Sequence, residues 1–396
     1  MAEWTEYTVA DVILTVIDYR GKTPKKLGGD WSESGYRALS AKNIKTGKIV
    51  QEDSIRYVSE KMYRCWMKEE IQKGDILITS EAPFGQIYYW DSYEKIVLSQ
   101  RLFAVRVNNT FYPKYIYFYM ISSLFQAELD CRATGTTVVG LRQPELLKCK
   151  ICAPDYQEQK RIADILWCIE QKINNNEMLN NNLEEQAKAI FSNEFLTLET
   201  LPDGWKQASL IDIADYLNGL AMQKYRPTDD EIGIQVLKIK ELRQGCCDNN
   251  SELCSPNIKS EYIIHDGDVI FSWSGSLLVD FWCGGICGLN QHLFKVYSKE
   301  YEPWLYYSWT KYHLTKFISM AADRATTMGH IKRDALEQAR VLIPCHDDYL
   351  EIGRLLQPLY DSMISNRVEI RKLSKLRDTL LPRLMSGELD VSNIEL

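Results

Sequence analysis

The chain has 396 residues, enough for two or three domains, and its composition of 45% hydrophobic, 11% aromatic and 26% charged residues is that of an ordinary globular protein. A net charge of −7 and a pI of about 5.5 exclude a uniformly basic nucleic-acid binder, although local basic patches remain compatible with them. The sequence has no basic-then-apolar signal region and no apolar run approaching about 18 residues. We therefore expect a soluble, cytoplasmic protein that contacts no membrane.

Residues 1–154 are predicted to form a globular α+β domain with many short strands. Gly74-Asp75 predicts a tight turn, and the apolar run Ile76–Ile78 after it predicts a buried strand. Gln100-Arg101 precedes another apolar run. A single helix is predicted from about Pro113 to Leu129.

Residues 155–197 predict a long helix with coiled-coil spacing. Its seam positions recur at alternating intervals of four and three residues, the pattern of a heptad repeat: Ile162, Leu166, Ile169, Ile173, Asn176, Asn180, Leu183, Ala187 and Ile190. Asp155 and Glu158, just after Pro154, predict a capped start. About 40 residues would span about 60 Å. One such helix cannot bury its own seam, so it needs a partner of similar length.

Residues 198–344 predict a second globular domain that repeats the framework of the first. Gly267-Asp268 is followed by the apolar run Val269–Phe271, and Gln291-His292 stands where Gln100-Arg101 stands in the first domain. Between these shared landmarks the two domains differ almost completely. The pattern predicts like frameworks with unlike contents.

Residues 345–396 supply the partner helix, displaced by 190 residues from the first. Its seam positions are Ile352, Leu356, Leu359, Met363, Asn366, Ile370, Leu373 and Leu380. Asn176 and Asn366 match, and two interpretations stay open: a buried Asn that fixes the register of pairing, or an Asn at the solvated edge. Pro358 is expected to kink the helix or delay its start. We predict antiparallel pairing, because each helix must lead from one globular domain back to the other.

Several short motifs recur in the order and spacing of a known family. They are Leu201-Pro-Asp-Gly-Trp205, the Lys73–Leu77 and Asp266–Ile270 segments, Asn290-Gln-His-Leu-Phe294, and the run from Gly135 to Ala163 that includes Asp155-Tyr-Gln-Glu-Gln-Lys-Arg-Ile162. Together with the duplication they resemble the specificity subunit of type I restriction-modification systems. The resemblance covers the whole chain. It implies two pseudo-symmetric target-recognition domains, 1–154 and 198–344, separated by helical regions 155–197 and 345–396 that pair as an antiparallel coiled coil.

The resemblance also implies a function. The chain would be a non-catalytic subunit in which each globular domain reads one half of a bipartite site in duplex DNA. The helices would set the spacer and dock two modification subunits, which bind S-adenosylmethionine, and restriction subunits that use ATP and Mg would join them. No cofactor or metal is expected in this chain. The alternatives are a coiled-coil assembly adaptor without DNA readout and a self-contained methyltransferase or nuclease.

Motifs for catalysis or metal binding are weak. Gly21-Lys22-Thr23 has Val16 where a phosphate-binding loop needs its first Gly, and there is no Asn/Asp-Pro-Pro-Tyr/Phe methylation motif. The repeat replaces Cys149 and Cys152 by Ala339 and Leu342, as expected for thiols in a strand. The denser set Cys246, Cys247, Cys254, Cys283 and Cys287 leaves a zinc site open, but small buried hydrophobes are favoured.

The candidate DNA contacts are cations that can bind phosphate and side chains that can read base edges. In the first domain they are Lys22, Lys25, Lys26, Lys42, Asn43, Gln100, Arg101, Arg142 and Gln143, with Arg20 and Lys45 nearby. In the second they are Lys224, Arg226, Lys238, Lys240, Gln291, His292, Arg324, Lys332 and Arg333, with Arg243 nearby. We predict a basic face on each domain. The alternative is an ordinary solvated charged surface.

Overall fold

The structure is a computed structural model that describes residues 4–135, 139–322 and 333–391. The chain divides into two compact units, residues 1–171 with 375–396 and residues 172–374. Each unit contains one globular part and a section of both long helices. The domain boundaries taken from the sequence stay a prediction, because this division passes through the helices.

The first unit contains eleven strands among its described residues: β1 (Thr5–Thr8), β2 (Ile13–Asp18), β3 (Tyr36–Leu39), β4 (Ile44–Lys45), β5 (Lys48–Ile49), β6 (Arg56–Val58), β7 (Ile76–Thr79), β8 (Ile87–Tyr89), β9 (Val97–Leu98), β10 (Leu102–Val107) and β11 (Lys150–Ala153). Its helices are α1 (Val9–Val12), α2 (Glu60–Trp66), α3 (Pro113–Ile121), α4 (Ser123–Arg132), α5 (Gln143–Leu147) and the start of α6 (Tyr156–Phe191).

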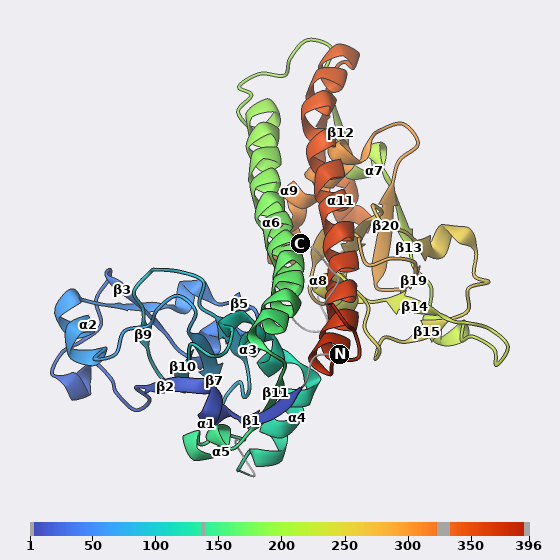
Figure 1. Ribbon diagram of the computed structural model, residues 1–396. Coiled ribbons are helices and arrows are strands. Elements are labelled where there is room, and N and C mark those ends of the chain that lie inside the picture. The colour runs from blue at the N-terminus through green and yellow to red at the C-terminus, as the bar shows by residue number, and fades with distance from the viewer. Residues whose placement is uncertain (1–3, 136–138, 323–332, 392–396) are drawn as a thin grey trace. The chain divides into compact units, whose positions relative to one another are not determined.

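Two sheets form the centre of the first unit. One has the antiparallel order β2-β10-β7-β8, and the other has the order β6-β3-β9 with β3 parallel to β9. A short β1-β11 ribbon joins the beginning of the unit to the strand that leads into α6 (Figure 1). The predicted buried strand after Gly74-Asp75 is confirmed, since every residue of β7 is buried.

The apolar core of the first unit lies between its four-stranded sheet and its helices. Phe103 and Val105 of β10 pack in one cluster with α3 residues such as Phe118 and with Leu166 of α6. The single helix predicted for this region is two helices, α3 and α4. The Ser122 amide still bonds to the Phe118 and Tyr119 carbonyls, but extended backbone at Ser122 breaks the rod there.

The second unit has strands β12 (Lys206–Ser209), β13 (Asp215–Asn218), β14 (Ile234–Leu237), β15 (Leu253–Cys254), β16 (Ile263–Ile264), β17 (Val269–Ser272), β18 (Leu278–Phe281), β19 (Cys287–Leu289), β20 (Leu293–Tyr297) and β21 (Arg340–Ile343). Its helices are α7 (Leu210–Ile213), α8 (Ile239–Gln244), α9 (Pro303–Ala322), α10 (Arg333–Glu337) and most of α11 (His346–Met385), together with the end of α6.

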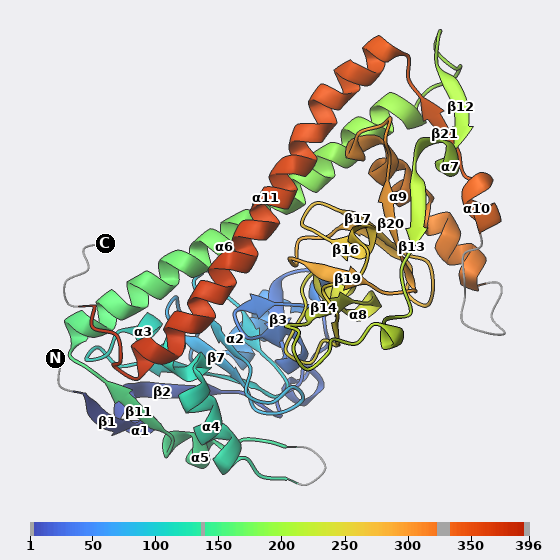
Figure 2. The ribbon, with the colours of Figure 1, turned by 90° about the vertical axis from the view of Figure 1, so that its right-hand side faces the viewer.

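The sheets of the second unit repeat those of the first. The antiparallel order β13-β20-β17-β18 matches β2-β10-β7-β8, and the order β15-β14-β19-β16 also contains one parallel pair, β14 with β19. The β12-β21 ribbon leads into α11 as β1-β11 leads into α6 (Figure 2). The predicted buried strand after Gly267-Asp268 is confirmed as β17. Like frameworks are therefore present in both units.

The two long helices run antiparallel. In the first unit Arg377 of α11 pairs with Glu170 of α6 at 3.0 Å, and in the second unit Glu369 pairs with Lys172 at 3.3 Å. The Asp155 carboxylate accepts hydrogen bonds from the amides of Gln157 and Glu158, which confirms the predicted cap of α6.

The expectation that Pro358 delays the start of the second helix is wrong, because α11 begins at His346. Pro358 and Arg354 both lie on the exposed side of α11. The Arg354 carbonyl, which has no N–H partner at Pro358, can therefore bond to water instead.

Candidate nucleic-acid interface

The turn between β9 and β10 places Gln100 and Arg101 at one end of the four-stranded sheet. The Gln100 carbonyl accepts a hydrogen bond from the Ala41 amide at 3.0 Å, which ties the turn to the neighbouring sheet. Arg101 has a φ of +61°, a left-handed conformation that side-chain-bearing residues rarely adopt. Its carbonyl accepts from both the amide and the hydroxyl of Ser80, at 2.9 and 3.2 Å. The Arg101 side chain thus projects from a fixed backbone.

Two ion pairs lie beside this turn. Arg101 Nε lies 3.0 Å from Glu81 Oε1. Arg20 Nε and Nη2 bind both carboxylate oxygens of Asp18, and its guanidinium lies over the Phe103 ring, 4.8 Å from the centroid. Bidentate pairing and ring stacking both restrict a guanidinium. Arg20 is therefore oriented before any ligand is bound, and Arg101 has a carboxylate partner beside it.

A polar hollow of about 930 Å³ opens at this sheet end. It is lined by Asp18, Arg20, Gly21, Ser80, Glu81, Gln100, Arg101, Thr134, Gly140, Leu141, Arg142 and Gln143. Four predicted DNA contacts, Gln100, Arg101, Arg142 and Gln143, therefore meet at one site although they are separated by about 40 residues of sequence. Guanidinium and amide groups grouped in this way can bind the edges of base pairs.

The equivalent place in the second unit carries different side chains. The strand register sets Phe294 opposite Phe271 and Asn218, just as Phe103 lies opposite Ile78 and Asp18. Asn218, Ser274 and His292 accordingly occupy the positions of Asp18, Glu81 and Arg101. His292 Nδ1 lies 3.2 Å from Ser274 Oγ, and Asn218 Oδ1 accepts from Trp273 Nε1 at 3.0 Å. Equivalent strand positions thus carry an arginine–glutamate pair in the first unit and a histidine–serine pair in the second.

The remaining cations predicted in the first unit lie between strands, with Lys25, Lys26 and Lys42 in short 3-10 helices. Lys25, Lys26 and Lys42 are exposed. Lys26 donates to the Gly21 carbonyl at 2.8 Å. Lys22 donates to the Trp66 carbonyl at 3.2 Å and lies over the Tyr19 ring, so it is held against its own domain.

Asn43 lies inside the first unit and is not available to DNA. Its side chain is 1% exposed, and its Oδ1 accepts from the amide and hydroxyl of Ser40 at 3.1 and 2.8 Å. Its Nδ2 donates to Ser54 Oγ and to the carbonyls of Val50 and Gln51. The prediction of a DNA contact is wrong here, because Asn43 caps the local turn and closes a loop from inside.

The predicted cations of the second unit are largely paired with acids. Arg226 and Lys238 both contact Glu252, and Lys240 lies 2.9 Å from Asp248. Hydrogen bonding from Lys238 holds the pKa of Glu252 below its usual range, and Lys240 does the same for the pKa of Asp248. The basic face predicted for this unit is therefore partly neutralised within the protein.

Other candidates of the second unit fall into two groups. Lys224 and Arg333 are exposed, and Gln291 and His292 lie in the β19–β20 turn, half-buried. Arg324 and Lys332 lie outside the described residues.

Asp18, Glu81, Asn218 and Ser274 were missed from sequence, although each lies beside a predicted contact. The sequence did contain a signal that could have identified Glu81 and Ser274. Glu81 and Ser274 both stand three residues after the last residue of a predicted apolar run, Ile78 or Phe271. Polar residues directly after matched strands of a duplicated framework point to a shared sheet end.

The predicted helix-pairing residues are buried to different degrees. Ile162, Leu166, Ile173, Asn176, Ile352, Leu356 and Met363 are buried, whereas Ile169, Leu183, Leu359, Asn366 and Leu373 are half-buried. Asn176 is 1% exposed and donates to Glu369 Oε2 at 2.7 Å, and Asn366 donates to Asn180 Oδ1 at 3.0 Å. Asn176 therefore matches the interpretation of a buried asparagine between the helices, not that of an asparagine at the solvated edge.

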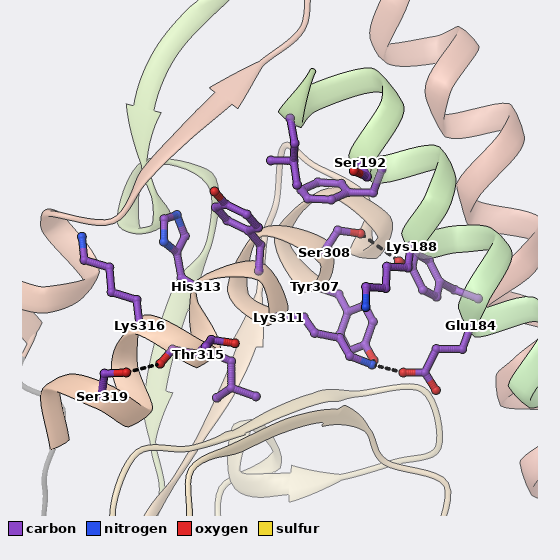
Figure 3. A pocket seen from close by; sticks show the side chains of 15 residues that line it. Glu184, Lys188, Ser192, Tyr307, Ser308, Lys311, His313, Thr315, Lys316 and Ser319 are labelled. Carbon is purple, nitrogen blue, oxygen red and sulfur yellow. Dashed lines mark hydrogen bonds and ion pairs between the residues drawn. The ribbon is translucent and has the colours of Figure 1, made fainter. Parts of the chain in front are cut away.

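A second cavity, of about 890 Å³, lies in the second unit between α6, α9 and Tyr360 of α11 (Figure 3). Lys311 contacts both Glu184 of α6 and the Tyr307 hydroxyl, while the hydroxyls of Ser308 and Tyr360 are 2.9 Å apart. These bonds fasten α9 to the paired long helices. The cavity shares no residue with the polar hollow.

His313, at the rim of this cavity, is expected to make the second unit sensitive to mild acid. Its Nε2–H donates to the Arg340 carbonyl at 2.7 Å, and burial lowers its pKa below 6.5. An unfolded histidine titrates near 6.5. The unfolded chain therefore binds more protons just below pH 6.5, and stability should fall with pH there by up to about 1.4 kcal/mol per pH unit.

The measurement is urea unfolding of the wild type and of His313→Gln at pH 7.5 and pH 5.5. The Gln amide can still donate to the Arg340 carbonyl, but it does not titrate. The wild type should lose more stability than the variant between the two pH values. Equal losses would rule out His313 as the source.

Comparisons with known proteins agree with one another. The family model described as "Type I restriction modification DNA specificity domain" matches residues 1–185 and 202–373. The specificity subunit of the type I restriction enzyme MjaIX from Methanocaldococcus jannaschii is 26% identical over 397 residues, with 94% of this chain and 87% of that protein covered. The HindI specificity subunit from Haemophilus influenzae is 18% identical over 405 residues, covering 81% and 88%.

A solved structure is similar in fold. The crystal structure of the S subunit of a type I restriction-modification system from M. genitalium superposes with a TM-score of 0.65 at 15% identity, covering 97% of this chain and 96% of that one. Among the described residues, none of the helices is both long and apolar enough to cross a membrane.

Proposed function

Because this chain belongs to the family of type I restriction modification DNA specificity domains, we propose that it reads the DNA sequence for a type I restriction-modification complex. Each globular part reads one half of a bipartite site in duplex DNA. The observation that carries this proposal is the repeated two-sheet framework, which presents an arginine–glutamate pair at one sheet end and a histidine–serine pair at the equivalent end of the other unit. Two unlike readers on like frameworks suit an asymmetric, divided site.

The polar hollow of the first unit is the proposed reading surface. Arginine and glutamine side chains distinguish base pairs through paired hydrogen bonds in the major groove, and Gln100, Arg101, Arg142 and Gln143 supply both types. Exposed lysines such as Lys25 and Lys42 would contact phosphates, which adds affinity without sequence information. Because such contacts release counterions, binding should weaken as salt rises.

The chain itself is proposed to be non-catalytic and to carry no cofactor. Methyl transfer would be performed by two modification subunits that bind S-adenosylmethionine, and cleavage by restriction subunits that use ATP and Mg. The complex would act in the cytoplasm, where the chromosome is accessible. Exposed apolar side chains on α6, Met178 at 70% and Leu179 at 51% exposure, support the docking of partner subunits on the long helices.

The long helices are proposed to set the spacer between the half-sites. A matched insertion of seven residues between Gln171 and Lys172 of α6 and between Ser374 and Lys375 of α11 tests this. It leaves the Glu170–Arg377 pair on one side and the Lys172–Glu369 pair on the other. Seven residues add about 10 Å of helix. The variant complex should therefore prefer DNA with a longer spacer, measured by binding to a series of spacer lengths.

The control inserts the same seven residues at the exposed joint between Leu198 and Pro202, outside both helices. It should keep the wild-type spacer. If the double helical insertion also keeps it, the helices do not set the spacing.

The proposed function itself is tested by selecting duplexes from a random DNA pool with the chain bound to its modification subunits. We expect enrichment of a bipartite motif, with affinity that falls as salt rises. An assembly adaptor would enrich no motif. Methylation or cleavage by the purified chain alone would identify a self-contained enzyme instead.

A further inference from the structure

We propose that Glu81 and Ser274 are positioning residues, each of which orients the base-reading side chain of its own unit, Arg101 in the first and His292 in the second. The inference rests on the proposed function and deepens it. It assigns a G·C base pair to the Arg101 position of the first half-site and a different readout to the equivalent position of the second.

Strand register establishes that the two pairs are equivalent. In the first unit Leu102 of β10 lies opposite Thr79 of β7, and in the second Leu293 of β20 lies opposite Ser272 of β17. Arg101 directly precedes Leu102, and His292 directly precedes Leu293. Glu81 stands two residues after Thr79, and Ser274 stands two residues after Ser272. The two pairs therefore occupy equivalent corners of two equivalent sheets, one in each unit.

The side-chain contact at this corner is kept although both partners differ. Arg101 Nε lies 3.0 Å from Glu81 Oε1, and His292 Nδ1 lies 3.2 Å from Ser274 Oγ. An acid faces a base in one unit, and a hydroxyl faces an imidazole in the other. A contact that survives the exchange of both side chains indicates that the pairing is the preserved feature.

The contact in the first unit leaves the reading end of Arg101 available. The ion pair joins Glu81 to Nε, so the two Nη groups at the end of the guanidinium carry N–H donors that this contact does not use. A forked donor of this kind matches the O6 and N7 acceptors of guanine in the major groove. The Arg101 backbone is fixed by Ser80, so the guanidinium starts from one defined place.

The second unit offers a different group. Because Nδ1 of His292 contacts Ser274, only the ring nitrogen Nε2 remains to contact a base. Nε2 lies 3.4 Å from Gln291 Nε2. A single ring nitrogen cannot form the paired hydrogen bonds that an arginine forms with guanine. The base preference at this position must therefore differ between the two half-sites.

The experiment selects DNA from a random duplex pool with the complex of the full chain and its modification subunits. Arg101→Ala should reduce the preference for G·C at one position of the first half-site by about 5- to 150-fold. Glu81→Gln keeps the size of the side chain and removes its charge. It should reduce the preference at the same position by about 2- to 5-fold, the scale of an exposed ion pair.

Three further measurements separate positioning from a structural role. Glu81→Gln removes an anion near DNA, so the affinity of the variant complex for non-specific DNA should be unchanged or raised. Damage to the fold would lower that affinity. The Glu81→Gln/Arg101→Ala double variant should be no worse than Arg101→Ala at that position. The unaltered second half-site is an internal control, and Ser274→Ala should change only that half-site.

The inference is overturned if Glu81→Gln has the wild-type profile at the first half-site, or if it weakens all sequences and both half-sites equally. It is also overturned if the Arg101 position shows no preference for G·C in the wild type. A wild-type complex that enriches no motif would overturn the proposed function and this inference with it. The first three results leave the proposed function standing.

Discussion

Asp75→Ala is expected to destabilise the first unit by about 3–5 kcal/mol, the usual loss when a buried ion pair keeps only one partner. Asp75 is 1% exposed, and its two oxygens each accept from Arg106, from Nε and Nη2 at 2.9 Å. It also caps the Gln72 amide at 2.8 Å in the turn before β7. The substitution removes the paired carboxylate from a largely buried guanidinium, which keeps only the half-exposed Glu69 and the Glu70 carbonyl as partners. Hydrogen–deuterium exchange in β7 and β10 should become about 10²- to 10⁴-fold faster.

The matched control is Asp268→Ala in the second unit. Asp268 ends the equivalent Gly-Asp turn and caps the His265 amide, but its partner Lys295 makes one contact, at 2.8 Å, and both side chains are about one-fifth exposed. The loss there should be about 1–2 kcal/mol. Equal losses in the two variants would contradict the role given to the buried bidentate pair.

Trp304→Ala is expected to destabilise the second unit by about 3–5 kcal/mol, because it empties a large site in the core. Trp304 of α9 is 1% exposed, and its ring centroid lies 5.0 Å from that of Tyr349 of α11, with the rings tilted by 40°. Gly353 makes room for it, since a Cβ at that glycine would lie 3.0 Å from Trp304 Nε1. Urea unfolding monitored by exchange in α9 and α11 measures the loss.

Lys114 is the counterpart of Trp304 in the repeat and provides the control. Its ammonium lies over the Trp167 ring, 4.3 Å from the centroid, and the side chain is only half-buried. Lys114→Ala should therefore lose about 0.5–1 kcal/mol from the first unit. A Trp304→Ala variant no less stable than Lys114→Ala would show that the α9–α11 packing is not essential.

The parts of the fold that could be predicted are those with a local signal. Heptad spacing located both long helices, and Gly-Asp turns located β7 and β17, because period and turn chemistry act over a few residues. The parallel pairing of β3 with β9 left no such signal, since it joins segments about 60 residues apart. The break at Ser122 was also missed, because Ser is compatible with either a helix or a cap.

The sequence predicted which positions form the candidate site, but it predicted few of the contacts that their side chains make. The duplication pointed to Gln100, Arg101, Gln291 and His292, and the structure places both pairs at equivalent sheet ends. The burial of Asn43 and the pairing of Arg226 and Lys238 with Glu252 depend on loop packing that sequence periodicity does not encode. Whether a polar residue faces solvent or the protein is a tertiary property.

The most direct test of the central claim is methylation profiling of the DNA of cells that carry this chain with its modification subunit. Cells with the chain should show methylation at one bipartite motif, with two different short half-sites and a fixed spacer. Cells that lack only this chain should show none of it. Methylation that persists without the chain, or that falls on a single contiguous motif, would contradict the account of two unlike readers in one specificity subunit.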